Sequence, residues 1–213
     1  MLVSKVLNEV KAHFKDQEGS HDWFHIERVW KMSILLHQKE GGDKEVIELC
    51  ALLHDISDHK YNGGNFEKGG QVAKEWILKC GGTSRIANRV AALIPGISYK
   101  GVEVTEDALP IEGLIVRDAD RLDAIGAMGI ARAFAYGGSR KRPLYNPSIK
   151  PVMHTSKEQY LNSKTHTVNH FYEKLLLLKE LLQTEAAKDI AKERHEFMKL
   201  FLDQFYKEWN VEP

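Results

Sequence analysis

The segment from Lys44 to Ile56 restricts the fold of this chain more than any other. A helix over these residues has almost no polar face, so other elements must surround it. We therefore predict that this helix lies at the centre of the fold. Its apolar residues are Val46, Ile47, Leu49, Cys50, Leu52 and Leu53.

Apolar residues recur at helical spacing through most of the remaining chain, and no useful stretch alternates with the period of a strand. Asp22 or Ser20 is suited to cap a second helix, and Asp43 to cap the central one. The pattern also predicts a helix that ends at Pro95 and one from Pro110 to about Tyr136. Two long helices close the chain, with Thr184 as the cap between them. The predicted fold class is all-α, with residues 1–213 in a single domain.

Composition excludes several classes of function. Lys plus Arg and Asp plus Glu each number 30 in 213 residues, whereas non-specific nucleic-acid binders carry a strong basic excess. The longest aliphatic run, Leu175 to Leu178, is too short to span a membrane, and the N-terminus lacks the apolar centre of a signal peptide. Cys50 is predicted to be a buried free thiol, and a disulfide to Cys80 stays open. We expect a cytoplasmic protein without nucleic acid or membrane as its main partner.

Three polar positions interrupt otherwise apolar helical faces. His25 shares a face with Val29 and Leu36, which points it toward the core; a hydrogen-bonded core histidine is the alternative for it alone. His54 and Asp55 end the central helix. A buried carboxylate is costly unless it is paired or bound to a cation. Adjacent helical residues diverge by about 100°, so both side chains reach one point only if the helix ends there. Alternatively, Asp55 caps a neighbouring element.

Asp120 is the third polar position. It precedes Ala124, Ala127 and Ala131 at helical spacing, and this small-residue stripe would let another helix approach closely. Two histidines and two aspartates on three helices form a nitrogen and oxygen ligand set suited to a divalent transition metal. Thiolate ligands are absent from this set, which argues against a structural zinc site.

These motifs resemble those of a known superfamily. HIERV, LLHDISD and DADRLDAIG are similar to the H…HD…D signature of the HD-domain metal-dependent phosphohydrolases, across residues 20–136. The fuller wording HDISDHKY and RDADRLDAIGAMGIARAFAYGG resembles the YpgQ-like bacterial group, which is described as nucleotide pyrophosphohydrolases. The resemblance implies an HD-domain helical bundle, with residues 156–210 as a helical C-terminal extension.

The resemblance also implies roles for individual residues. By motif, His25, His54, Asp55 and Asp120 correspond to the ligands of one divalent ion, expected to be Mn²⁺, with Ni²⁺, Co²⁺, Fe²⁺ and Mg²⁺ as alternatives. Asp58 is similar to the acid that related phosphohydrolases carry after the HD pair, and it is assigned water activation; a carboxylate in a C-terminal turn is the alternative.

Substrate phosphates require cations, and several are available. The cluster Arg140, Lys141 and Arg142 is expected to close over the distal phosphates of a nucleotide, with Gly137 and Gly138 as its hinge. Ordinary surface charge is the alternative for each cation, and surface ion pairs are expected to join Arg117, Asp118, Arg121 and Asp123. The further candidates for substrate contact are His21, Arg28, Lys60, Arg117 and Arg121.

His166 and His170 have the spacing of paired zinc ligands, but their stretch reads HTVNH and lacks the glutamate of that motif. Both are predicted to be solvated. Tyr136 and Tyr145 are candidates to flank a base.

The preferred function is hydrolysis of nucleotides, as a pyrophosphohydrolase that releases pyrophosphate. A 5′-nucleotidase, a ppGpp hydrolase and a non-catalytic nucleotide-sensing module are alternatives, and so is a homodimer. A di-iron oxygenase would need further histidines between Asp55 and Asp120, where only His59 occurs.

Overall fold

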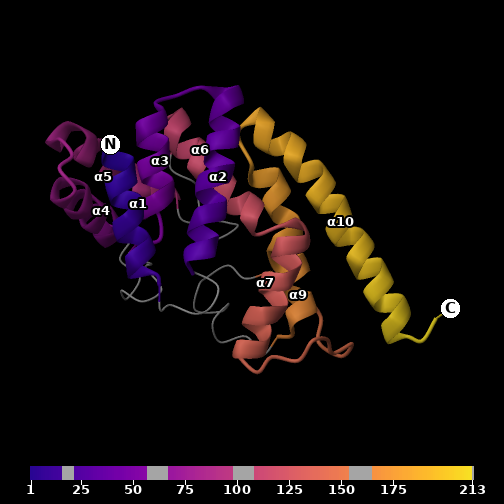
Figure 1. The fold of residues 1–213 in the computed structure, drawn as a ribbon. Helices are drawn as coiled ribbons and strands as arrows, with labels where there is room; N and C mark the ends of the chain where they lie inside the picture. The colour runs from indigo at the N-terminus through magenta and orange to yellow at the C-terminus, as the bar shows by residue number, and fades with distance from the viewer. Residues whose placement is uncertain (16–21, 57–66, 98–107, 154–164, 213) are drawn as a thin grey trace. The chain divides into compact units, whose positions relative to one another are not determined.

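A computed structural model describes residues 1–15, 22–56, 67–97, 108–153 and 165–212 (Figure 1). These ranges contain helices and no strand, which confirms the predicted all-α class. No helix among them is long and apolar enough to cross a membrane. The helices are α1 (Leu2–His13), α2 (Trp23–Glu40), α3 (Lys44–Leu53), α4 (Glu67–Lys79), α5 (Ser84–Ile97), α6 (Ile111–Asp123), α7 (Gly126–Ser139), α9 (Thr167–Glu173), the 3₁₀ helix η1 (Leu175–Leu181) and α10 (Glu185–Trp209).

The described residues up to Asp120 form one compact unit, and those from Arg121 onward form a second. The boundary falls within α6. The organisation into a core at 20–136 and an extension at 156–210 stays a prediction.

In the first unit, α3 packs against α1, α2 and α5 (Figure 1). Seven of its ten residues are buried, so the prediction of a central helix is confirmed. Cys50 is one of them, and it is a free thiol. Burial raises the pKa of this thiol far above its ordinary value, so Cys50 is a packing residue and not a nucleophile.

An ion-pair clamp fixes the start of α3. Arg89 of α5 reaches Asp43 at 2.7 Å and Glu112 of α6 at 2.8 Å. Glu112 also accepts from the Asp43 backbone N–H at 3.1 Å, and the Asp43 side chain caps α3 by accepting from Val46 N. These bonds tie α3, α5 and α6 together at one end of the unit.

Helix α5 does not end at Pro95 as predicted but contains it. Proline has no N–H, so the Ala91 carbonyl lacks its usual partner four residues on. Gly70 of α4 lies against that carbonyl, and a Cβ there would come within 2.4 Å of Ala91 O. The helix continues for only two residues beyond this proline.

The prediction of one helix from Pro110 to about Tyr136 is wrong. Helix α6 ends at Asp123, and α7 starts at Gly126, whose φ of 73° lies in the left-handed region that favours glycine. Ala127 and Ala131 are exposed, so the small-residue stripe does not form. The local backbone at Gly126 overrides the helical pattern on either side of it.

The second unit contains α7, α9, η1 and α10, which pack on one another. Phe134, Phe171, Phe201 and Phe205 form an aromatic cluster at its centre, with ring centroids 5.9–6.4 Å apart. The expected pair of long closing helices is wrong, because a short helix and a 3₁₀ helix precede the single long helix α10. Thr184 occupies the predicted cap position but makes no side-chain cap hydrogen bond.

Candidate metal centre

His25 lies in the first turn of α2 and is fully buried. The predicted cap at Asp22 is confirmed: its side chain accepts a 2.9 Å hydrogen bond from the His25 backbone N–H. The cap satisfies one of the free N–H groups of the helix start. It therefore also fixes the turn that positions the imidazole.

His54 directly follows α3, and residues 54–56 form a turn. Its Nδ1 lies 2.8 Å from the Ala51 carbonyl oxygen, which can only accept, so Nδ1 carries the proton. In the neutral ring the lone pair is then on Nε2. Because the helix ends at Leu53 and not at Ile56, the neighbouring Asp55 can turn toward the same point.

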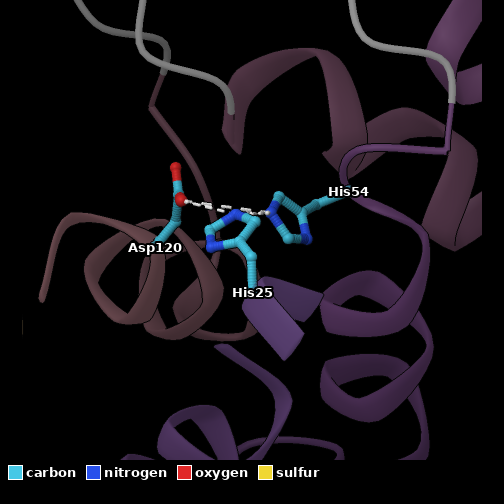
Figure 2. Close-up of side chains that lie close together, drawn as sticks. All are labelled: His25, His54 and Asp120. Carbon is cyan, nitrogen blue, oxygen red and sulfur yellow. Dashed lines mark hydrogen bonds and ion pairs between the residues drawn. The ribbon is translucent and has the colours of Figure 1, made fainter. Parts of the chain in front are cut away.

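Figure 2 shows how the rings of His25 and His54 meet the carboxylate of Asp120. The two Nε2 atoms are 3.4 Å apart. Asp120 Oδ1 lies 3.5 Å from Nε2 of His25 and 4.0 Å from Nε2 of His54. Ligand atoms of these three residues all lie within 4.8 Å of one another and could hold a metal ion.

Asp55 lies beside this group of three but outside the set whose ligand atoms are all within 4.8 Å of one another. Its Oδ2 lies 3.4 Å from Nε2 of His25 and 3.6 Å from Nε2 of His54. Donor atoms that surround one ion at about 2.0–2.2 Å are about 3–3.5 Å from their neighbours. The donor types and separations therefore fit a divalent transition ion after a small contraction.

The cluster has a closed side and an accessible side. The imidazole side chains are 1% exposed, whereas those of Asp55 and Asp120 are 12% and 26% exposed. The histidines face the protein interior, and solvent reaches the carboxylates. A substrate would therefore approach past the carboxylates.

The predicted surface ion pairs around α6 are wrong. Arg117, Asp118, Arg121 and Asp123 are all buried. Arg121 donates from Nη1 to the Leu181 carbonyl, and Asp123 pairs with Arg132 of α7. A role for Arg117 and Arg121 in phosphate contact stays a prediction, although their burial leaves little surface for it. Arg28 lies half-buried on α2, three residues after His25.

The cation cluster Arg140, Lys141 and Arg142 lies in the second unit and directly follows α7. The guanidinium carbons of Arg140 and Arg142 lie 5.5 Å and 5.7 Å from the Tyr136 ring centroid. No ion pair to these cations occurs in the described part of the chain. The expected hinge is wrong: Gly137 and Gly138 belong to α7, and a Cβ at Gly137 would meet the Thr167 hydroxyl at 2.1 Å.

The prediction that His166 and His170 are solvated is also wrong. His166 is fully buried and caps α9. Its Nδ1 accepts from Asn169 N at 3.2 Å, and its Nε2 donates to Ile149 O at 3.1 Å. Burial lowers the pKa of His166, and burial with nearby Lys174 and Arg142 lowers that of His170 to about 3. The sequence signal for this role is that His166 stands directly before the residues that form α9.

His21, Asp58 and Lys60 lie outside the described residues. The water-activating role of Asp58 and the substrate contacts of His21 and Lys60 therefore stay predictions.

Comparison with known proteins identifies the class. The HD domain family matches residues 23–125, which include all four candidate ligands. YpgQ of Bacillus subtilis, a protein described as uncharacterized, is 34% identical over 93% of this chain and 89% of its own. An HD-superfamily hydrolase from Bacillus thuringiensis has a similar crystal structure, with a TM-score of 0.77, 40% identity, and coverage of 99% of this chain and 97% of that one. The structure of YpgQ in complex with ADP matches with a TM-score of 0.77 and 31% identity, over 97% and 94% of the two chains.

The match to the HD domain family and the similarity to an HD-superfamily hydrolase identify the class as metal-dependent hydrolase. The chain belongs to the HD domain family, and its activity is that of a metal-dependent phosphohydrolase.

Proposed function

We propose that this enzyme cleaves nucleoside triphosphates and releases pyrophosphate, with one Mn²⁺ ion held by His25, His54, Asp55 and Asp120. The observation that carries the proposal is that ligand atoms of His25, His54 and Asp120 all lie within 4.8 Å of one another, while Asp55 Oδ2 lies 3.4 Å and 3.6 Å from the two imidazole Nε2 atoms. Two carboxylates and two neutral imidazoles offer two negative charges, which balance a divalent cation.

The chain's own residues prepare this site. The Ala51 carbonyl holds the His54 tautomer that leaves Nε2 free to ligate, an outer contact of the kind that orients metal-bound histidines. The Asp22 cap fixes the backbone of His25 at the start of α2. A bound divalent ion polarises a phosphoryl oxygen and lowers the pKa of a water molecule that it coordinates. Asp58 is placed by the sequence four residues after His54, and we propose that it accepts the proton of the attacking water.

Two observations support a nucleotide as the substrate. The related YpgQ crystallises with ADP, so a relative with the same fold binds a nucleoside phosphate. The cation cluster presents three positive side chains without acidic partners in the described ranges, and two of them, Arg140 and Arg142, lie over the Tyr136 ring. Its density of charge suits the distal phosphates of a triphosphate better than a single phosphate.

A panel of nucleoside mono-, di- and triphosphates, assayed with Mn²⁺, tests this function. Products should be resolved as orthophosphate or pyrophosphate. We expect equal amounts of nucleoside monophosphate and pyrophosphate from triphosphates. Release of orthophosphate from monophosphates alone would identify a 5′-nucleotidase and refute the proposal.

The proposed metal centre has a matched control. Asp120→Asn should abolish both hydrolysis and Mn²⁺ binding, whereas Asp189→Asn on the exposed surface of α10 should leave both intact. Hydrolysis that persists in the Asp120→Asn chain, with no metal detected by elemental analysis, would show that the centre is not catalytic.

A further inference from the structure

The second unit contains a cavity of about 170 Å³ that the metal centre does not use. Tyr145 from the loop after α7, Tyr172 from α9 and Tyr206 from α10 form its aromatic walls. The rings of Tyr145 and Tyr206 lie 5.4 Å apart at an interplanar angle of 70°, so they form a corner and not a stack. Tyr206 and Tyr172 share a hydrogen bond, and burial together with this bond raises the pKa of Tyr206. The walls are therefore neutral and fixed.

Two polar groups line the same cavity. Asn169 is buried, and its side-chain Nδ2 donates to Ile149 O at 3.2 Å. Its carboxamide oxygen accepts no hydrogen bond from the described residues, which leaves it available to a ligand. Lys150 lies exposed at the cavity, and no acidic side chain pairs with it in the part of the chain that the structure describes.

Size and chemistry together restrict the ligand. An enclosed cavity of about 150 Å³ accommodates one benzene-sized ring. This pocket is open to solvent, so one ring can lie in it while the rest of a nucleotide lies outside. The tyrosines provide contacts for a planar ring. The Asn169 oxygen can accept from a hydrogen-bond donor on that ring, and Lys150 can pair with an anion outside it. A nucleotide of adenine, guanine or cytosine carries an amino group on a flat ring, and its phosphate lies beyond the ring.

We propose that this cavity is a second binding site, specific for a nucleoside monophosphate that carries an exocyclic amino group. The ring contacts the tyrosine corner, the amino group donates to Asn169 and the phosphate pairs with Lys150. The choice of a monophosphate rests on the proposed function, because release of pyrophosphate leaves this organic product. Tyr145 and Lys150 follow the cation cluster on one segment, and His166 and Asn169 hold that segment at the Ile149 carbonyl. Product bound here would brace the segment that carries the cluster.

The binding of AMP, measured by calorimetry in EDTA, tests the site. The full-length Asp120→Asn chain is used so that the metal centre contributes nothing. In this background Lys150→Gln and Tyr172→Ala should each weaken AMP binding about tenfold, the effect of losing one good contact. Lys192→Gln, which removes another exposed lysine, from α10, should change nothing. Both pocket residues are exposed, and circular dichroism verifies that the variants fold.

Further ligands separate the parts of the site. CMP should bind about as well as AMP, and UMP several-fold more weakly, because uracil has a carbonyl where cytosine has an amino group. Adenosine should bind without sensitivity to Lys150→Gln. The proposal is overturned if AMP gives no binding at millimolar concentration, if Asp120→Asn abolishes binding, or if both pocket variants bind like the parent. These assays need no turnover, so failure of triphosphate hydrolysis in the separate panel would leave their result standing.

Discussion

His54 in the first unit and His166 in the second are both buried, and each lies next to a helix. His54 directly follows α3, and His166 directly precedes α9. Their ring nitrogens form different contacts. His54 donates Nδ1–H to a backbone carbonyl and turns Nε2 toward His25 and two carboxylates. His166 uses both nitrogens on the backbone, one as acceptor and one as donor. The first ring keeps a lone pair for a ligand, and the second has none left.

This difference shows what separates a ligand histidine from a structural one. Burial does not, because both rings are almost completely buried. Spacing does not either, because His166 and His170 have the sequence spacing of a zinc pair. The number of ring nitrogens that the backbone already occupies makes the distinction.

Exchange of each histidine for alanine gives the largest expected contrast. His54→Ala should lower hydrolysis at least about a hundredfold and remove bound metal, because a ligand is lost. His166→Ala should keep stoichiometric metal, since both of its ring nitrogens are bonded to the backbone. Metal content by elemental analysis and kcat of the purified chains provide the measurement. Loss of metal from the His166→Ala chain, with its secondary structure intact, would invalidate the distinction.

The cation cluster tests whether the second unit contributes to substrate binding at all. Neutralising Arg140, Lys141 and Arg142 together should raise KM for a nucleoside triphosphate about tenfold or more and that for a monophosphate far less. The effect should shrink at high salt, because exposed contacts are screened. Neutralising the exposed lysines 188, 192 and 199 of α10 is the matched control. Equal changes of KM for both substrates would assign the cluster to ordinary surface charge.

Acid should weaken the second unit through His170. Its pKa is about 3 in the folded chain, against an ordinary value of 6.5, so the unfolded chain takes up a proton first as pH falls. Stability is therefore complete above pH 6.5 and is lost as pH falls from 6.5 toward 3, by up to about 1.4 kcal/mol per pH unit. Urea unfolding between pH 7.5 and 5 measures this slope. His170→Asn should flatten it, whereas His13→Asn on the exposed face of α1 should not; an unchanged slope in His170→Asn would contradict the assignment.

The smallest expected effect concerns the cap itself. His166→Ala removes the acceptor for Asn169 N and should lower the free energy of unfolding by about 0.5–2 kcal/mol. His166→Asn retains an acceptor at the cap position and should recover part of that loss. Thermal melts of the two variants provide the comparison. Equal melting temperatures for His166→Ala and the parent would show that the cap is not stabilising.

The sequence predicted the helical class, the central helix and the caps at Asp22 and Asp43, because each depends on neighbours within a few residues. It also predicted that His25, His54, Asp55 and Asp120 lie close together, because each is a polar residue on an otherwise apolar part of its helix. The burial of Arg117 and Arg121 was not predictable, since it depends on partners far along the chain, such as the Leu181 carbonyl. The break at Gly126 was missed because the helical pattern continues across it.

Helix α3 carries seven buried residues in a length of ten, and His54 follows it directly. In evolutionary terms this helix has few positions at which substitutions are neutral, and these are the exposed Lys44 and Glu45 at its start. A larger or smaller side chain at any of the other positions must be accommodated by a shift of the helix, because interiors are close-packed. That shift would carry the imidazole with it. Substitutions at the buried positions of α3 should therefore alter the metal affinity of this enzyme before they unfold it.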